Sequence, residues 1–325
     1  AIHQAYADAG AEFISTNTFG ANGLKFDNVE ELVQAATALV RRTGKKVVLD
    51  IGPLGKLLQP MGELAFDDAY DLFARTIRAG APGADLVLIE TMSDTLELKA
   101  AVLAENCALP VFTTMIMDEK GRLLTGADIE TAVTMLEGLG VDALGFNCSM
   151  GPDQMLPLVA QLRELTCLPI IVNPNAGLPE SVNGETVYNV DPEAFAEKME
   201  AIAKLGVSYL GGCCGTTPAH IAKMIQRVKD IPAVVHTPAP RTLVSSYSQT
   251  VELGKKPVIV GERINPTGKK LMKAALREKD INYLIKEGIA QKDKGAHILD
   301  VNVGLPEIDE PAMMQQALFA LQGGL

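Results

Sequence analysis

The sequence has 325 residues, of which 47% are hydrophobic, and a formal net charge of −11, a length that allows one large domain and part of another. It has no basic patch carrying aromatic residues, which excludes a nucleic-acid partner, and no apolar run near the roughly 20 residues of a membrane-spanning helix. Five cysteines in so long a chain do not make a disulfide framework, so we expect a cytoplasmic protein with reduced thiols that are available to a metal.

Short apolar segments alternate with helical patterns over the first two thirds of the chain. The apolar segments have about five residues each, as parallel strands buried on both faces do. Between them, apolar residues recur every three or four positions, which predicts helices. The predicted strands are 13–18, 47–51, 86–90, 111–117, 143–147, 170–173 and 208–212. The predicted helices include 3–9, 67–79, 95–105, 128–139, 153–165 and 192–205.

This alternation predicts a parallel sheet, either doubly wound or closed into a (β/α)8 TIM barrel. No glycine-rich phosphate turn follows an early strand, which disfavours the doubly wound fold. The first element is a helix at 3–9, whereas a barrel places a strand before that helix. We therefore predict a barrel of residues 1–230 that lacks its first strand and the true N-terminus, with a gap between the strands at 13–18 and 208–212.

The composition changes after residue 230. Residues 231–256 are rich in proline and serine, which predicts a linker. A new pattern then begins, with a strand at 258–260, a helix at 270–294 and a strand at 298–301. So short a segment cannot close a barrel of about 250 residues. We therefore predict that residues 257–325 are the start of a second, truncated (β/α)8 barrel.

Three cysteines follow two of the predicted strands. Cys148 comes directly after the strand at 143–147, and Cys213 and Cys214 come directly after the strand at 208–212. In a parallel barrel the active site lies at the carboxyl ends of the strands, so these thiols should lie within about 4–5 Å of one another. Three sulfurs with one open position are typical of a catalytic zinc site. The alternatives are three structural cysteines or a vicinal disulfide.

Three thiolates on zinc suit one kind of reaction. A substrate thiol in the open position loses its proton to become a thiolate at neutral pH. The thiolate is then a nucleophile, so the pattern favours alkyl transfer to sulfur over activation of water.

Six segments resemble the homocysteine S-methyltransferase family, in the family's order and over about residues 1–228. The resemblance implies that Cys148, Cys213 and Cys214 bind zinc, and that Glu90 helps to hold the ammonium group of homocysteine. The family's Asp-Gly motif on strand one is absent from this sequence. The six segments are Asn17-Thr18-Phe19-Gly20, Asp50-Ile51-Gly52-Pro53, Glu90-Thr91-Met92-Ser93-Asp94, Asn147-Cys148-Ser149, Asn173-Pro174-Asn175-Ala176-Gly177 and Gly211-Gly212-Cys213-Cys214-Gly215.

Three polar residues of these motifs are predicted to contribute to the homocysteine site. Glu90 ends a strand inside the mouth of the barrel, where a carboxylate pairs with an amino group; otherwise it is a capping or ion-pair residue. Asn17 lies near the end of the first predicted strand. Asn175 lies between the strands that carry the cysteines, so its oxygen either fills the fourth position on zinc or only shapes the turn after Pro174.

Two segments after the linker, 261–268 and 295–302, resemble the first two strand ends of pterin-binding methyltetrahydrofolate domains. The resemblance implies that Asn265, Asp300 and Asn302 bind the folate, since a pterin offers a mixed donor and acceptor edge. Asn and Asp are also common turn residues at strand ends, which is the alternative interpretation.

The order of the two resemblances implies part of a larger enzyme. In that enzyme homocysteine receives its methyl group from methylcobalamin, giving methionine, and methyltetrahydrofolate methylates the cobalamin again. The cobalamin-binding module would lie beyond Leu325. The alternatives are a stand-alone homocysteine S-methyltransferase that uses S-methylmethionine or betaine, and a non-catalytic barrel with a structural zinc.

Overall fold

The computed structural model of the protein describes residues 1–105, 107–182, 184–232, 234 and 236–324. The chain divides into two compact units. The first comprises Ala1–Leu57 and Leu64–Ala239, and the second comprises Leu58–Glu63 and Pro240–Leu325. Within the described residues, no helix is both long enough and apolar enough to cross a bilayer.

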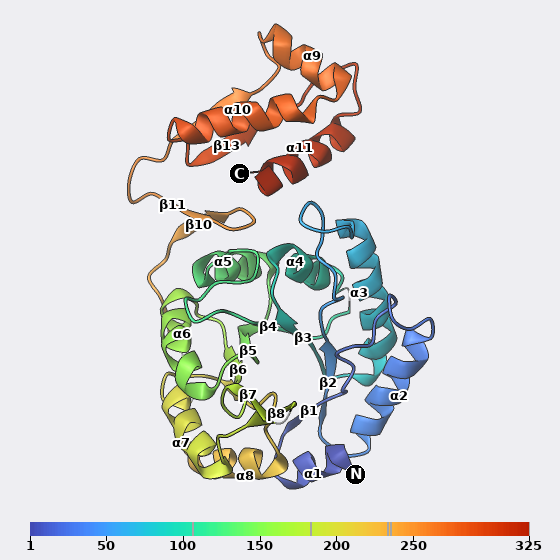
Figure 1. Ribbon diagram of the computed structural model, residues 1–325, viewed down its shortest axis with the longest axis vertical. Coiled ribbons are helices and arrows are strands. Elements are labelled where there is room, and N and C mark those ends of the chain that lie inside the picture. The colour runs from blue at the N-terminus through green and yellow to red at the C-terminus, as the bar shows by residue number, and fades with distance from the viewer. Residues whose placement is uncertain (106, 183, 233, 235, 325) are drawn as a thin grey trace. The chain divides into compact units, whose positions relative to one another are not determined.

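A parallel sheet of seven strands forms the centre of the first unit, in the order β1-β2-β3-β4-β5-β6-β9. Its strands curl around a common centre, with the helices on the outside (Figure 1). The sheet is buried on both faces over most of its length, as the continuous apolar runs predicted. The strands are β1 Phe13–Ser15, β2 Lys46–Ile51, β3 Leu86–Met92, β4 Val111–Met115, β5 Ala143–Asn147, β6 Ile170–Asn173 and β9 Tyr209–Leu210.

The sheet is open between β1 and β9, as predicted. Among the described residues, β1 pairs with β2 alone and β9 with β6 alone. The rings of Phe13 and Tyr209, one from each edge strand, meet edge to face with their centroids 5.8 Å apart. Both edge strands are shorter than predicted. Asn17 adopts a left-handed backbone with φ of 59°, so the chain turns away soon after β1 ends.

Helices follow the strands and cover the outer face of the sheet (Figure 1). Several begin where the sequence provides a cap. The carboxylates of Asp94, Asp128 and Asp191 accept hydrogen bonds from backbone N–H groups of the first turns of α4, α5 and α7. The helices of this unit are α1 Ile2–Asp8, α2 Val29–Arg41, α3 Phe66–Gly80, η1 Ala81–Gly83, α4 Thr95–Leu103, α5 Ile129–Leu139, α6 Pro152–Leu165, α7 Pro192–Ala203 and α8 Pro218–Val228.

A β-hairpin that the sequence pattern did not predict lies between β6 and α7. It consists of β7 (Pro179–Val182) and β8 (Glu185–Tyr188), which pair antiparallel with Pro179 opposite Tyr188. Its residues are largely polar and exposed, so they lack the alternation of apolar and polar residues that reveals a strand. The hairpin brings Tyr188 back to the carboxyl end of the sheet.

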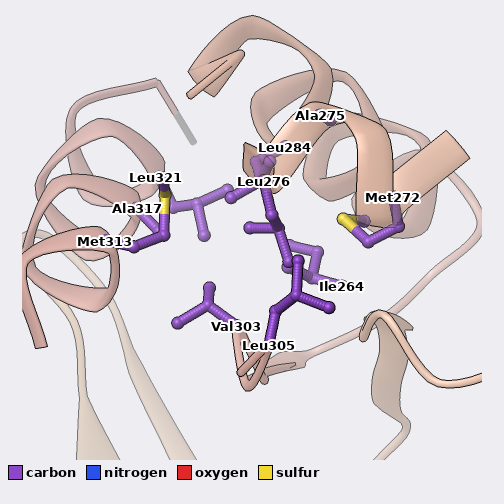
Figure 2. Packing of buried hydrophobic residues seen from close by; sticks show 10 residues of the cluster. All are labelled: Ile264, Met272, Ala275, Leu276, Leu284, Val303, Leu305, Met313, Ala317 and Leu321. Atoms are coloured by element: carbon purple, nitrogen blue, oxygen red, sulfur yellow. The ribbon is translucent and has the colours of Figure 1, made fainter. Parts of the chain in front are cut away.

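The second unit has its own small core (Figure 2), formed by Ile264, Met272, Ala275, Leu276, Leu284, Val303, Leu305, Met313, Ala317 and Leu321. Two strands, β12 (Val260–Ile264) and β13 (Ile298–Val301), pair in parallel. The helices are α9 Lys270–Glu278, α10 Ile281–Asp293 and α11 Glu310–Gly324. The truncated second barrel stays a prediction, because this parallel sheet has two strands among the described residues.

Three details of this unit differ from the sequence analysis. The strand predicted at 258–260 is found further along the chain, at Val260–Ile264 (β12). The predicted helix at 270–294 is two helices, because Lys279 adopts a left-handed backbone with φ of 54° and Asp280 caps α10. A hairpin of β10 (Thr242–Ser245) and β11 (Thr250–Leu253) lies within the predicted linker 231–256.

A substitution at Gly145 would test the close contact between β5 and β6. A Cβ at this position would lie 1.7 Å from the carbonyl oxygen of Ile171, so Gly145→Ala should lower the free energy of unfolding by about 3 kcal/mol or more, or prevent folding. Gly138→Ala is the control, because this exposed glycine of α5 has nothing within 4 Å of its added Cβ; it should be neutral or stabilise by up to about 1 kcal/mol. Urea denaturation measures both, and equal stabilities would contradict the assigned register.

Candidate metal centre

Three cysteine sulfurs meet at the carboxyl end of the seven-stranded sheet. The Sγ atom of Cys214 lies 3.8 Å from that of Cys148 and 3.9 Å from that of Cys213, and all three lie within 4.8 Å of one another. Sulfurs bound tetrahedrally to one zinc ion at about 2.3 Å would be about 3.8 Å apart. The observed arrangement is therefore close to the one that a zinc ion requires. Among the described residues, no other cluster of three His, Cys, Asp or Glu side chains could hold an ion.

An unusual backbone turn directs Cys148 toward the other two cysteines. Cys148 and Ser149 both adopt left-handed conformations, with φ of 56° and 55°, directly after β5 ends. Such conformations cost about 1–3 kcal/mol each for residues other than glycine, and they cluster at functional sites. The amide of Cys148 donates a hydrogen bond of 3.0 Å to the carbonyl of Asn173, so β6 holds this turn in place.

The turn that carries Cys213 and Cys214 is held by the segment after β6. The amide of Cys213 donates to the carbonyl of Pro174 at 2.8 Å, and the carbonyl of Cys214 accepts from the amide of Ala176 at 2.9 Å. The amide of Cys214 donates to Oδ1 of Asn175 at 3.1 Å, and the Asn175 side chain is buried. In this structure Asn175 therefore positions the cysteine pair, whereas its ligation of zinc stays a prediction.

The pKa values of Cys148 and Cys213 are shifted in opposite directions. Hydrogen bonding with Cys213, followed by contributions from the Ser149 amide, Cys214 and Asn175, lowers the pKa of Cys148 to about 5. The same hydrogen bond, with burial, raises the pKa of Cys213 well above its ordinary range. The cluster thus holds a thiolate stabilised by a neighbouring thiol, and a divalent cation among the sulfurs would take the place of that proton.

Glu90 interacts with the cysteines, and a second carboxyl group, Asp50, interacts with Glu90. Burial is the main cause that raises the pKa of Glu90, on β3, to about 9. The negative charge of Asp50 and a hydrogen bond with Asp50 also raise this pKa. Burial also raises the pKa of Asp50 on β2, to about 6. At neutral pH the pair therefore retains one proton and carries about one negative charge. Asn147 connects the pair to the cysteines, because its Nδ2 lies 3.3 Å from Oε2 of Glu90 and the next residue is Cys148.

The predicted homocysteine-site residues of the first unit differ in their position relative to the cysteines. Glu90 and Asn175 lie beside the cysteines through the contacts above. Asn17 lies after β1 with an exposed side chain, and its neighbour Thr18 donates to the carbonyl of Asp50 at 2.6 Å. Their roles in binding homocysteine stay predictions.

Sequence reasoning missed two members of this neighbourhood. Asp50 belongs to one of the motifs, so its place at a strand end was a signal for it. Tyr188 gave no signal, because the hairpin that positions it was not predicted. Its pKa is raised to about 12 by burial, by a hydrogen bond with Cys214 and by the charges of the three cysteines.

The predicted folate residues lie at the strand ends of the second unit. Asn265 follows β12, Asp300 lies on β13 and Asn302 follows it. The Oδ1 atoms of Asn265 and Asn302 accept hydrogen bonds from the amides of Thr267 and Gly304. Both asparagines thus form local turns in this structure, and folate binding by the three residues stays a prediction.

Comparison with known proteins gives the family context. The family profile described as "Homocysteine S-methyltransferase" matches residues 1–228. The chain is 35% identical to the methionine synthase of Mycobacterium tuberculosis over 330 residues, and 35% identical to that of Mycobacterium leprae over 335 residues. Each match covers 93% of this chain but 27% and 28% of those proteins. The chain thus spans little more than a quarter of these relatives.

Solved structures resemble the first unit in fold. The homocysteine methyltransferase MmuM from Escherichia coli, in its oxidised and metallated forms, is 21% identical, with a TM-score of 0.59 for each form. Each match covers 70% of this chain, and it covers 82% and 83% of the two MmuM chains. At this level of identity the likeness establishes the fold alone.

The raised pKa of Glu90 predicts a pH dependence of stability. Its ordinary pKa is 4.5 and its folded pKa about 9, so between these values the folded state keeps a proton that the unfolded state has lost. The free energy of unfolding should therefore fall as pH rises. Between pH 6 and 8.5, Glu90→Gln should remove roughly 1–3 kcal/mol of that fall. Urea denaturation of the metal-free protein measures it, with Glu119→Gln, an exposed loop residue, as the control. Equal pH dependence in the two variants would show that Glu90 is not protonated.

Proposed function

Because the chain belongs to the homocysteine S-methyltransferase family, we propose that its first unit binds zinc and presents homocysteine, as a thiolate, to a methyl donor. The observation that carries this proposal is the cluster of Cys148, Cys213 and Cys214, whose sulfurs lie within 4.8 Å of one another. Three sulfurs leave one position of a tetrahedral ion for the substrate, whereas a structural zinc site has four protein ligands.

The residues present fit a zinc ion. Sulfur is a preferred zinc ligand, and the spacing of 3.8–3.9 Å between neighbouring sulfurs suits a tetrahedral ion. Zinc at this place would lower the pKa of a bound thiol, so that homocysteine is nucleophilic at neutral pH. The chain's own contribution is to hold the three cysteines through the hydrogen bonds that Asn173, Pro174 and Asn175 accept from the cysteine amides.

We assign the ammonium group of homocysteine to Glu90, with Asn17 and Asn175 as further contacts. Glu90 lies on β3 beside the sulfur cluster, and its charge is among those that act on Cys213. With Asp50 it carries about one negative charge at neutral pH, which would attract a positively charged ammonium group. The cation would favour release of the shared proton, so binding and ionisation of the pair are coupled.

The methyl donor is assigned from the wider context of the chain. We propose that the methyl group comes from methylcobalamin held by a separate module, and that methyltetrahydrofolate supplies it through a folate site that includes Asn265, Asp300 and Asn302. The names of the mycobacterial relatives support a methionine synthase. Free cysteines fit a reducing, cytoplasmic compartment.

The alternative donors, S-methylmethionine and betaine, belong to stand-alone enzymes. Such enzymes have no pterin domain, whereas this chain continues into a second unit with its own core. That unit is included in the matches to the methionine synthases, which cover 93% of the chain. These observations favour the larger enzyme.

X-ray absorption tests the proposed centre. The zinc-loaded chain should show three sulfur ligands and one lighter ligand, and four sulfurs after homocysteine is added, because thiolate binds zinc more strongly than an oxygen ligand does. Cys148→Ser should lose a sulfur ligand. Cys167→Ser, at an exposed cysteine outside the cluster, should leave the spectrum unchanged. Four sulfurs before substrate is added would refute the mechanism.

Glu90→Gln separates substrate binding from metal binding. The variant lacks the ionised carboxylate that an ammonium group would favour, so homocysteine should bind about tenfold more weakly, since a hydrogen bond to a charged group contributes roughly 1.5–3 kcal/mol. Zinc content should stay near one ion per chain. Calorimetry measures homocysteine binding and metal analysis the zinc. Loss of zinc in this variant would mean that Glu90 belongs to the metal site.

A further inference from the structure

The side chain of Asn147 links two strands that are not neighbours in the sheet. Asn147 is the last residue of β5, whereas Glu90 and Thr91 lie on β3, and β4 separates these strands. Asn147 is completely buried, and its carboxamide makes three hydrogen bonds to Glu90 and Thr91. The link therefore crosses the carboxyl end of the sheet, the same edge at which the cysteines lie.

The hydrogen bonds fix which way the carboxamide of Asn147 is turned. The backbone amide of Thr91 can only donate, and it lies 3.0 Å from Oδ1 of Asn147, so that atom is the acceptor. The Nδ2 atom of Asn147 then faces the other two partners. It donates to Oγ1 of Thr91 at 2.7 Å and to Oε2 of Glu90 at 3.3 Å. Because Nδ2 carries two hydrogens, both bonds can form at once.

The backbone that carries Glu90 is irregular and needs this support. Thr91 adopts a left-handed conformation with φ of 63°, which is rare and strained for a β-branched residue. The pairing of β3 with β4 also shifts register between Ile89 and Met92, on either side of Glu90 and Thr91. Such irregularities re-aim side chains. Two of the three bonds from Asn147 hold Thr91, so the direction of the Glu90 side chain depends on Asn147.

Asn147 is also adjacent to the metal centre along the chain. The next residue is Cys148, whose left-handed turn brings its sulfur to the other two cysteines. One residue is thus bonded to the carboxylate and covalently joined to a cysteine of the cluster. A ligand that places a thiol at the cluster and an ammonium group at Glu90 needs these two places at a fixed separation. Side chains that support a site through hydrogen bonds maintain such a separation.

We propose that Asn147 is a positioning residue, whose carboxamide holds the Glu90 carboxylate toward the ammonium group of homocysteine. This inference rests on the proposed function, because it requires homocysteine to bind with its thiol at the metal and its ammonium group at Glu90. Asn147 acts through Glu90 and does not touch the substrate. Its contribution is to the choice of an amino thiol over thiols that lack an amino group.

Calorimetry on the zinc-loaded full chain tests this with two ligands, homocysteine and γ-mercaptobutyrate, which is homocysteine without its amino group. Asn147→Ala should bind homocysteine about three- to tenfold more weakly, because a residue that acts through Glu90 cannot cost more than the roughly tenfold expected for Glu90→Gln. Its affinity for γ-mercaptobutyrate and its zinc content should not change. The double variant of Glu90→Gln with Asn147→Ala should lose no more than Glu90→Gln alone.

Thr114→Val is the control. It removes a buried hydroxyl of β4, the strand between β3 and β5, and this hydroxyl has no hydrogen-bond partner among the described residues. The control should bind both ligands as the unmodified chain does. The inference is overturned if Asn147→Ala matches the control, if it weakens both ligands equally while zinc is retained, or if its loss multiplies with that of Glu90→Gln.

A crystal structure of the unmodified chain with zinc and homocysteine decides the matter if Asn147→Ala does not retain zinc. The Nδ2 atom of Asn147 should remain on the Glu90 carboxylate, with the ammonium group on Glu90. A carboxamide that contacts homocysteine itself, or a Glu90 side chain turned away from Asn147, would overturn the inference. An unmodified chain that does not bind zinc, or that binds both ligands equally well, would instead refute the proposed function.

Discussion

The parallel register of β5, β6 and β9 is the constraint on which the sulfur cluster depends. Asn147 lies opposite Asn173, and Val172 lies opposite Leu210, so these strands end at the same edge of the sheet. As thiolates the three cysteines would repel one another, so their charges do not bring them together. The backbone hydrogen bonds of the sheet therefore hold the sulfurs close, and the left-handed turn at Cys148 supplies the final orientation.

Negative charge and shared protons accumulate at this edge. A thiolate at Cys148 and a carboxyl pair at Asp50 and Glu90 lie in partly buried surroundings, where unbalanced charge is costly. Protons on Cys213 and on the carboxyl pair limit that cost. A metal ion and an ammonium group are cations that would replace those protons, so the site is arranged for the two kinds of charge that we propose it binds.

The sequence was informative where the chain has regular apolar strands, and less so elsewhere. The seven-stranded parallel sheet and its gap were predictable because strands buried on both faces produce continuous apolar runs, and glycine and cysteine motifs marked the strand ends. The β7–β8 hairpin was not predictable, because its exposed strands carry polar residues without alternation. Tyr188 was missed with it. The break at Lys279 was also missed, because lysine is a good helix former and only its left-handed backbone reveals the end of α9.

The open side of the sheet has a consequence for behaviour in concentrated solution. An unpaired strand edge is a template on which another chain can add a strand, and long flat edges promote aggregation. Here β1 has three residues and β9 has two, and the rings of Phe13 and Tyr209 meet between them. Such short edges offer few free N–H and C=O groups to a neighbouring molecule. We therefore expect the open sheet to resist edge-to-edge polymerisation.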